Sequence, residues 1–272
     1  MPLVAMTLEM GSLGKEVAEG IAAALGLEPL HHEIIGDLAD KMRVRKSHVI
    51  RFLEGGASMF EKLTADRTSQ SIFTAAETFD LAQRQDGTVI FGWGATQLLR
   101  PVAHAVCVRV CAPFELRVER TMKWLSTDDE SFVREEVENS DQAHGAIMRR
   151  HFDADWRDAM QYDLTLNTER IPVEQCVEQV LALARSPRFR ETRESLATLD
   201  NLALSARVRA ALRSDARTRK ANVLVESEAG SVTLSGIVDG DMEPDSLSEV
   251  AARVAGVKAA ANHVRRVKTP YY

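Results

Sequence analysis

Hydrophobic and polar residues follow two spacings along the first part of the chain, one typical of buried strands and one typical of amphipathic helices. A short apolar run at residues 3–6 predicts a buried strand. Val17, Ile21 and Leu25 follow at intervals of four residues, which predicts a helix that begins directly after Gly14. A tight glycine turn is therefore expected between a strand and the N-terminus of a helix.

The same alternation of strands and helices continues to about residue 185. Thr127 and Glu130 form a capping box, which predicts a helix that starts there and ends near Glu138. The other predicted elements are strands at 88–91, 105–110 and 163–167 and helices at 69–85, 115–124 and 172–184. Strands separated by helices are typical of an α/β fold, in which helices cover both faces of a parallel sheet and ligands bind at the carboxyl ends of the strands.

The last part of the chain has a different pattern. Residues 186–202 are polar and charged with few apolar anchors, and we interpret them as a linker with some helical character. Alternating residues at 222–226 and 231–238 predict two strands joined by a Glu-Ala-Gly turn. Helical spacing precedes and follows these strands, and a last strand runs from Val257 to Val267. We expect residues 203–272 to form a small α+β domain with its own core.

The turn before the first helix has the chemistry of a phosphate-binding loop. Gly11, Ser12, Leu13, Gly14 and Lys15 would place backbone N–H groups, the positive end of the helix dipole and an ammonium group around one point. The full motif also has a glycine at position 9 and a hydroxyl residue at position 16, where this chain has two glutamates. A plain turn with a helix cap is the alternative interpretation, and the motif alone does not decide between the two.

Composition and charge exclude several classes of protein. The 272 residues are 45% apolar and 27% charged, as in ordinary globular proteins. The net charge of −6 argues against a general nucleic-acid-binding protein, so no nucleic-acid partner is expected. Cys107 and Cys111 lie on one predicted strand about 13 Å apart, too far for a disulfide. Without a signal-peptide pattern or a long apolar segment, we expect a cytoplasmic protein.

Several blocks within residues 1–185 resemble, in the same order, those of the cytidylate-kinase-like family of P-loop proteins. The matching blocks are the phosphate loop (7–15), the Glu-Ile-Ile block (33–35) and the Val-Ile-Phe-Gly-Trp-Gly-Ala block (89–95). They are followed by a strand and helix (109–113, with Arg117 and Arg120) and by the lid with the last strand (149–168). The resemblance implies the fold of a nucleoside monophosphate kinase, with ATP and Mg²⁺ as cofactors. It also implies transfer of the ATP γ-phosphoryl group to CMP or a similar small acceptor.

The resemblance implies roles for several residues. Lys15 would contact the donor phosphates, and Arg149 and Arg150 on the lid would close over the transferring group as catalytic residues. A solvated helix face is the alternative for the two arginines. The implied substrate-binding residues are His32, Gly92, Trp93 and Arg117.

The chain departs from the family at four positions where arginine is expected, namely Leu8, His32, Trp93 and His144. A charge-assisted hydrogen bond to phosphate contributes about 1.5–3 kcal/mol, so the missing arginines weaken the acceptor site most. The donor site keeps its backbone groups and its lysine. Protonated histidines supply positive charge only at low pH, and their spacing does not indicate a metal site, so no metal ligands are predicted. An impaired kinase and an inactive nucleotide-sensing regulator both remain open.

Residues 203–269 resemble a BON domain. The resemblance lies in the segment 232–238, the helix that follows it, and the segment 254–258. BON domains are linked to phospholipid or ligand binding, which implies a protein, ligand or anionic lipid partner. Arg265, Arg266 and Lys268 fit such a surface, but a charged strand edge that prevents aggregation is the favoured interpretation.

Overall fold

The computed structural model describes residues 2–27, 67–84, 87–92, 94–239 and 242–267. By its internal contacts the chain divides into two compact units, Met1–Arg67 with Arg84–Thr192 and Thr68–Gln83 with Arg193–Tyr272. In each unit, a separate cluster of buried apolar side chains lies between one face of the sheet and the helices that cover it. The two units are therefore described one at a time.

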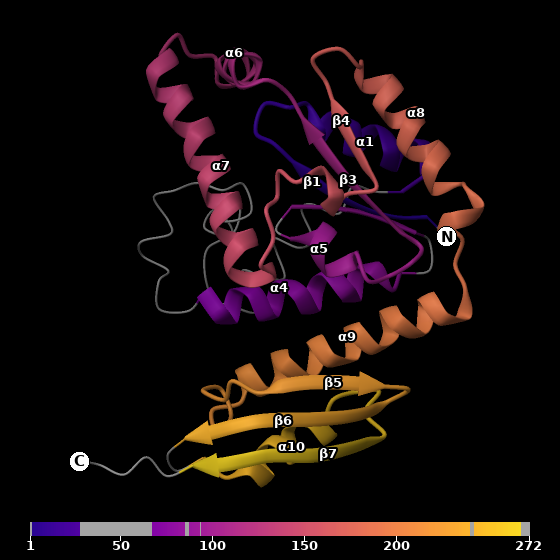
Figure 1. The fold of residues 1–272 in the computed structure, drawn as a ribbon, viewed down its shortest axis with the longest axis vertical. Coiled ribbons are helices and arrows are strands. Elements are labelled where there is room, and N and C mark those ends of the chain that lie inside the picture. Colours follow the sequence, from indigo (N-terminus) through magenta and orange to yellow (C-terminus); the bar gives the residue numbers. More distant parts are fainter. Residues whose placement is uncertain (1, 28–66, 85–86, 93, 240–241, 268–272) are drawn as a thin grey trace. The chain divides into compact units, whose positions relative to one another are not determined.

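The first unit is built on a four-stranded sheet (Figure 1). Its strands are β1 (Leu3–Leu8), β2 (Thr88–Phe91), β3 (Ala105–Cys111) and β4 (Leu164–Asn167). They lie in the order β2-β1-β3-β4, and all pairs are parallel. The parallel sheet confirms the predicted α/β fold. Because parallel strands end at the same edge, the loop after β1 lies beside the carboxyl ends of β2 and β3.

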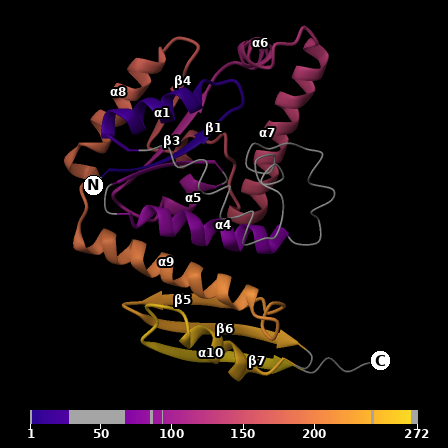
Figure 2. The ribbon, with the colours of Figure 1, turned by 180° about the vertical axis from the view of Figure 1, so that it is seen from behind.

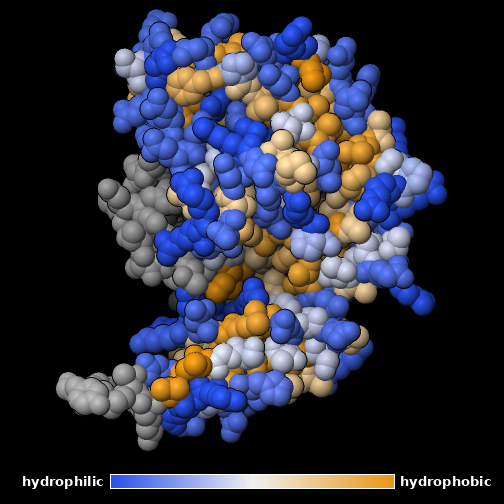
Figure 3. Space-filling view, in the orientation of Figure 1, coloured by the Kyte–Doolittle hydropathy of each residue, from blue (hydrophilic) through white to orange (hydrophobic). Residues whose placement is uncertain are grey.

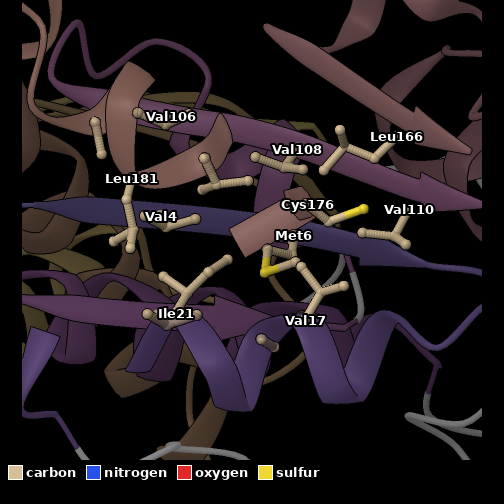
Figure 4. Close-up of a cluster of buried hydrophobic side chains, with 14 of the residues drawn as sticks. Val4, Met6, Val17, Ile21, Val106, Val108, Val110, Leu166, Cys176 and Leu181 are labelled. Carbon is tan, nitrogen blue, oxygen red and sulfur yellow. The ribbon is translucent and has the colours of Figure 1, made fainter. Parts of the chain in front are cut away.

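Helices cover both faces of this sheet (Figure 1, and from behind in Figure 2). α1 (Gly14–Leu25) and α8 (Val173–Ala184) pack against one face, where their apolar side chains join those of the strands in the cluster shown in Figure 4. α5 (Ala95–Leu99) lies on the other face, where the hydroxyls of Thr96 and Thr7 are 2.9 Å apart. Successive residues of a strand point to opposite faces, so β1 contributes to both layers.

The helix that follows α6 (Phe114–Leu125) has an N-cap residue different from the one predicted. α7 (Glu130–Phe152) has Asp129 as its N-cap, and the Asp129 carboxylate accepts the N–H of Phe132 at 3.0 Å. The predicted capping box at Thr127 was wrong. The Thr127 hydroxyl accepts the N–H of Asp129, before the helix begins, at 3.2 Å. The Thr-x-x-Glu pattern predicted threonine as the N-cap, but an aspartate two residues later fills that position.

α7 is also much longer than predicted, because it continues past Glu138 to Phe152. Apolar residues keep their helical spacing in this part, and Ala143, Ile147 and Met148 are buried. No proline interrupts the segment. The helix ends where Asp153 adopts a left-handed conformation, with φ 49°. The tertiary packing of its second half could not be inferred from the capping signal.

The second unit contains a three-stranded sheet with two helices against one face. Its elements are α9 (Arg193–Ser214), β5 (Leu224–Glu228), β6 (Ser231–Asp239), α10 (Pro244–Ala252) and β7 (Ala259–Val267). β5 and β6 pair antiparallel, and β6 pairs with β7 in parallel. Both helices contribute to the core over this sheet, which confirms the predicted α+β unit. The stretch predicted as a linker, 186–202, contains the 3₁₀ turn Pro187–Phe189 and the beginning of α9.

The other face of this sheet carries exposed apolar side chains. Leu224, Ile237 and Val267 are 51%, 65% and 48% exposed. Figure 3 shows hydrophobic side chains gathered on the visible face of this unit. Arg265 pairs with Ile237 across β6 and β7, so a cationic residue lies within the same apolar surface.

α4 (Arg67–Ala82) groups with the second unit, although it lies early in the sequence. The Gln83 side-chain amide donates to the Asp200 carboxylate at 2.6 Å. Arg207 lies 3.7 Å from the carboxylate of Asp80. The helix predicted at 69–85 is present but ends at Ala82, and these contacts tie it to α9.

Neither disulfides nor membrane-spanning helices are found in the described ranges. Cys107, Cys111 and Cys176 are free thiols, as strand geometry predicted for the first two. Burial, with the nearby charge of Asp163, raises the pKa of Cys107 to about 12, so this thiol stays protonated. No helix in these ranges is long and apolar enough to cross a membrane.

Replacing Asp129 with alanine removes the acceptor at the N-terminus of α7. We expect the free energy of unfolding to fall by about 1 kcal/mol, as for other N-cap aspartates. Thr127→Ala is the matched control, because Thr127 accepts an N–H that lies outside the helix, and its loss is expected to be smaller. Urea unfolding of both variants measures the difference. An equal or larger loss in Thr127→Ala would contradict the assigned cap.

Candidate functional site

The loop between β1 and α1 is a tight turn at the carboxyl edge of the sheet. The Ser12 N–H donates to the Glu9 carbonyl at 3.0 Å, and Gly11 (φ 75°) and Leu13 (φ 60°) have left-handed backbone conformations. Leu13 is the N-cap of α1 and supplies no side-chain acceptor. The first N–H groups of an α-helix have no partner within the helix, so here they can serve a ligand. The turn presents these donors and the positive end of the helix dipole to an anion.

Gly11 lies so close to α6 that no side chain fits at this position. A Cβ at Gly11 would lie 2.4 Å from the carbonyl oxygen of Arg117 and 2.7 Å from Thr121 Oγ1. The nearer of these atoms belongs to the backbone and cannot rotate away. α6 therefore forms one wall of the loop and holds it in shape.

A cavity of about 260 Å³ lies over the loop and the first turn of α1, and we call it the loop cavity. Its lining includes all the residues predicted to bind phosphate, namely Gly11, Ser12, Leu13, Gly14 and Lys15. Residues from β2 and its end, from α6 and from α7 complete the lining, among them Gly92, Arg120, Trp124 and His144. The Lys15 side chain is 64% exposed and lies 3.9 Å from the Glu19 carboxylate, so its ammonium group is held only weakly.

Arg120 is a cation of the loop cavity that was not among the predicted site residues. Its two terminal nitrogens donate to the hydroxyl and the carbonyl of Thr168, at 2.8 and 3.0 Å. The Thr168 hydroxyl also lies 2.7 Å from the Ser12 carbonyl, so the end of β4 connects Arg120 to the loop. The sequence did contain a signal, because Arg120 and Trp124 lie four residues apart on one face of α6.

Arg117 does not line the loop cavity, which differs from the substrate contact predicted for it. Its side chain is buried, and its terminal nitrogens bind the two oxygens of Asp141 at 3.0 and 2.7 Å. Its Nε lies 3.4 Å from Glu9 Oε2. The guanidinium group is therefore enclosed by two carboxylates. In this arrangement Arg117 positions the loop against α7 and presents no charge to a substrate.

Glu9 stands where the motif has its first glycine, and its carboxylate is paired beneath the loop. Oε1 accepts from Arg109 Nη2 at 2.5 Å, and Oε2 accepts from the Ala112 N–H at 3.3 Å. With Arg117 as a further partner, two cations surround one buried carboxylate. The substitution of glutamate for glycine thus adds no uncompensated negative charge next to a phosphate.

Arg149 and Arg150 lie in the last turns of α7 with exposed side chains. Arg149 lines a second cavity, of about 490 Å³, together with Asp141 and Arg157. Neither Arg149 nor Arg150 lines the loop cavity that holds Lys15. The structure therefore does not bring the three predicted catalytic cations together.

The other predicted residues have different outcomes. Gly92 follows β2 and lines the loop cavity, with φ 104°. His32 and Trp93 lie outside the described residues. Among the residues that are described, no three His, Cys, Asp or Glu side chains are grouped in a way that could hold a metal ion.

A family model described as the cytidylate kinase-like family matches residues 3–170. The chain belongs to the cytidylate kinase-like family. A second model, that of the BON domain, matches residues 200–268, so a BON domain follows the kinase-like domain. A comparison with curated proteins finds no match.

Solved structures that align with this chain were also found. An uncharacterized protein from Eubacterium ventriosum ATCC 27560 aligns with a TM-score of 0.53 and 16% identity, over 67% of this chain and 97% of its own. Shikimate kinase from Acinetobacter baumannii, in complex with shikimate, aligns with a TM-score of 0.43 and 16% identity, over 70% of this chain and 96% of its own. Shikimate kinase from Bacteroides thetaiotaomicron aligns with a TM-score of 0.42 and 12% identity, over 68% of this chain and 99% of its own. The first likeness indicates a shared fold, and the family match identifies it as a nucleotide-binding, kinase-like fold.

The loop of the kinase-like domain contains buried polar atoms that suit a phosphate group. Within the described part of the chain, Ser12 Oγ and Thr121 Oγ1 are buried without a hydrogen-bond partner. Both residues line the loop cavity. A buried hydroxyl without a partner costs free energy, and phosphate oxygens would accept from both hydroxyls. The residues present therefore fit a nucleotide phosphate.

Gly11→Ala is expected to abolish nucleotide binding by the kinase-like domain, because the new methyl group would collide with the Arg117 carbonyl and displace the loop. Gly26→Ala is the matched control, since Gly26 also has a positive φ (69°) but no atom of the described residues lies within 4 Å of its Cβ position. It should lose about 1–2 kcal/mol of stability and keep its affinity. Calorimetric titration with ATP and Mg²⁺, beside thermal unfolding, separates the two effects. Unchanged affinity in folded Gly11→Ala would contradict the tight packing of loop and α6.

Proposed function

We propose that the protein binds ATP with Mg²⁺ in the loop cavity and transfers the γ-phosphoryl group to CMP or a similar small acceptor. The observation that carries this proposal is the convergence of the glycine turn, the first turn of α1, Lys15 and Arg120 on one cavity. Phosphoryl transfer depends mainly on positioning and on neutralising negative charge. The loop cavity supplies both for the phosphates of a donor nucleotide.

The two cations of the loop cavity suit different tasks. Lys15 has an exposed, weakly paired ammonium group, which is free to follow the phosphates as they move. Arg120 has a planar guanidinium group held by Thr168, which suits a fixed phosphate oxygen pair. Trp124, which is 72% exposed at the rim, offers an apolar surface to the nucleoside.

Mg²⁺ would be held mainly by the phosphate oxygens of the nucleotide and by water, as is usual for this ion. Glu16 lines the loop cavity at the position of the hydroxyl ligand in the full motif, and its carboxylate would supply a further oxygen ligand. When bound, the ion would neutralise charge on the β- and γ-phosphates. Glu9 is unsuited to this role because its carboxylate is already paired with two arginines.

An acceptor site needs cations around a second phosphate. We propose that Arg149 and Arg150 supply them when the end of α7 approaches the loop cavity. The contributions of His32, Gly92 and Trp93 to acceptor binding stay predictions. His144 lines the cavity where the family resemblance places an arginine, so the acceptor site has less permanent positive charge than the family pattern implies.

Nucleotide sensing without transfer is a second candidate function, and the placement of the arginines favours it. Arg117 is held by Asp141 and Glu9, and Arg149 lies in a different cavity from Lys15. On this alternative, nucleotide binding alone sets the state of the kinase-like domain. The BON domain then binds a protein, a ligand or an anionic lipid surface.

Lys15→Ala and Arg120→Ala test the donor site. Each removes one charge-assisted contact worth about 1.5–3 kcal/mol, so we expect the Kd for ATP with Mg²⁺ to rise roughly 10- to 100-fold. Lys123→Ala is the matched control, because Lys123 is an exposed cation of α6 that pairs with Glu119 outside the cavity. Calorimetric titration gives the affinities.

A transfer assay with CMP, UMP and dCMP distinguishes the two functions. Transfer by the wild-type protein that is lost in Lys15→Ala supports the kinase. Tight ATP binding without transfer to any of the three acceptors supports sensing. A wild-type protein that binds no ATP at millimolar concentration would contradict both.

A further inference from the structure

His144 is fixed at the wall of the loop cavity, which it lines from α7 together with Lys15 and Arg120. Its ring stacks on the ring of Trp156, with centroids 5.3 Å apart and planes inclined by 23°. Its Nδ1 lies 3.2 Å from the carbonyl oxygen of Ser140, one helical turn earlier. These two contacts hold the imidazole in one orientation.

The Ser140 contact decides which nitrogen carries the proton when the ring is neutral. A carbonyl oxygen can only accept, so Nδ1–H donates to it and Nε2 keeps a lone pair. A lone pair repels phosphate oxygens, whereas the Nε2–H of an imidazolium donates to them and adds a positive charge. Neutral His144 is therefore an unfavourable neighbour for phosphate, and protonated His144 is a favourable one.

The surroundings of His144 favour its neutral form. Burial lowers its pKa, and the Ser140 carbonyl, Asp141 and Glu9 oppose this only in part. Glu9 and Asp141 are themselves paired with arginines, as described above. The charged groups that line the loop cavity with His144 are Glu9, Lys15, Glu16 and Arg120. Arg117 lies between Glu9 and Asp141, and Arg109 and Arg157 each lie 5.6 Å from the centre of the Trp156 ring.

We propose that His144 is a proton-linked phosphate ligand: a nucleotide polyphosphate enters the loop cavity together with one proton, which resides on Nε2. The inference rests on the proposed function, because it requires a polyphosphate in this cavity. The proton comes from solvent, and no covalent bond forms or breaks. Binding takes up a proton at any pH between the pKa of free His144 and its higher pKa in the complex. Affinity therefore falls as the pH rises from the pKa of free His144 to its pKa in the complex, and it levels off above the pKa of the complex.

Calorimetric titration of the full chain with ATP and Mg²⁺ tests this, at pH 6, 7 and 8 and in two buffers with different ionisation enthalpies. We expect wild type to take up more protons than His144→Gln. Its Kd should also rise more steeply with pH, by up to about tenfold per pH unit. His263→Gln is the matched control, because His263 is an exposed histidine on β7 in the second unit, and it should behave as wild type. Thermal unfolding verifies that each variant is folded.

The variant comparison isolates His144 from the nucleotide itself. A terminal phosphate also titrates, near pH 6, but it does so equally with wild type and with His144→Gln. His144→Arg supplies a permanent charge, and we expect ATP binding that stays tight at pH 8, without the proton uptake of wild type.

Equal proton uptake in wild type and His144→Gln would overturn the inference. So would a loss of affinity in His144→Gln that is the same at every pH, because it indicates a neutral hydrogen bond. In both cases ATP still binds and the proposed function stands. No ATP binding at any pH would overturn the proposed function together with the inference.

Discussion

The buried carboxylate of Glu9 is the group on which the rest of the phosphate loop depends. It accepts from Arg109 on β3 and from the Ala112 N–H, and it lies beside Arg117 on α6. An unpaired buried charge is strongly destabilising, so the two arginines are needed wherever the glutamate is present. Their positions in turn bring the backbone of α6 against Gly11, where only glycine fits. One ion-pair cluster thus sets the shape of the loop.

The same cluster extends to the long helix and determines which cations can meet a ligand. Asp141 on α7 binds Arg117 and Arg157, so the middle of α7 is tied to the loop through charge. Arginines used in this way are no longer available to phosphate. The permanent cations that line the loop cavity, within the described residues, are Lys15 and Arg120. A donor nucleotide has suitable partners there, whereas Arg149 and Arg150, the cations proposed for the acceptor, do not line this cavity.

The order of strands and helices and the position of the loop could be predicted, because apolar spacing and the Gly-Ser-Leu-Gly-Lys pattern are local signals. The roles of Arg117 and Arg120 could not, because they lie three residues apart on one helix and only tertiary contacts distinguish them. Arg117 meets Asp141, far along the chain, whereas Arg120 meets Thr168 at the end of β4. In the sequence, Glu9 is only a departure from the motif's first glycine. Its role depends on tertiary contacts, because its partners lie on other elements.

A crystal structure with a non-hydrolysable ATP analogue and Mg²⁺ would decide whether the loop cavity is the nucleotide site. We expect the analogue's phosphates to lie against the backbone N–H groups from Gly11 to Lys15, with Lys15 and Arg120 in contact with them. The Glu9 cluster should remain intact beneath the loop. An analogue bound in the cavity of Arg149 and Arg157, with the loop cavity empty, would contradict this assignment.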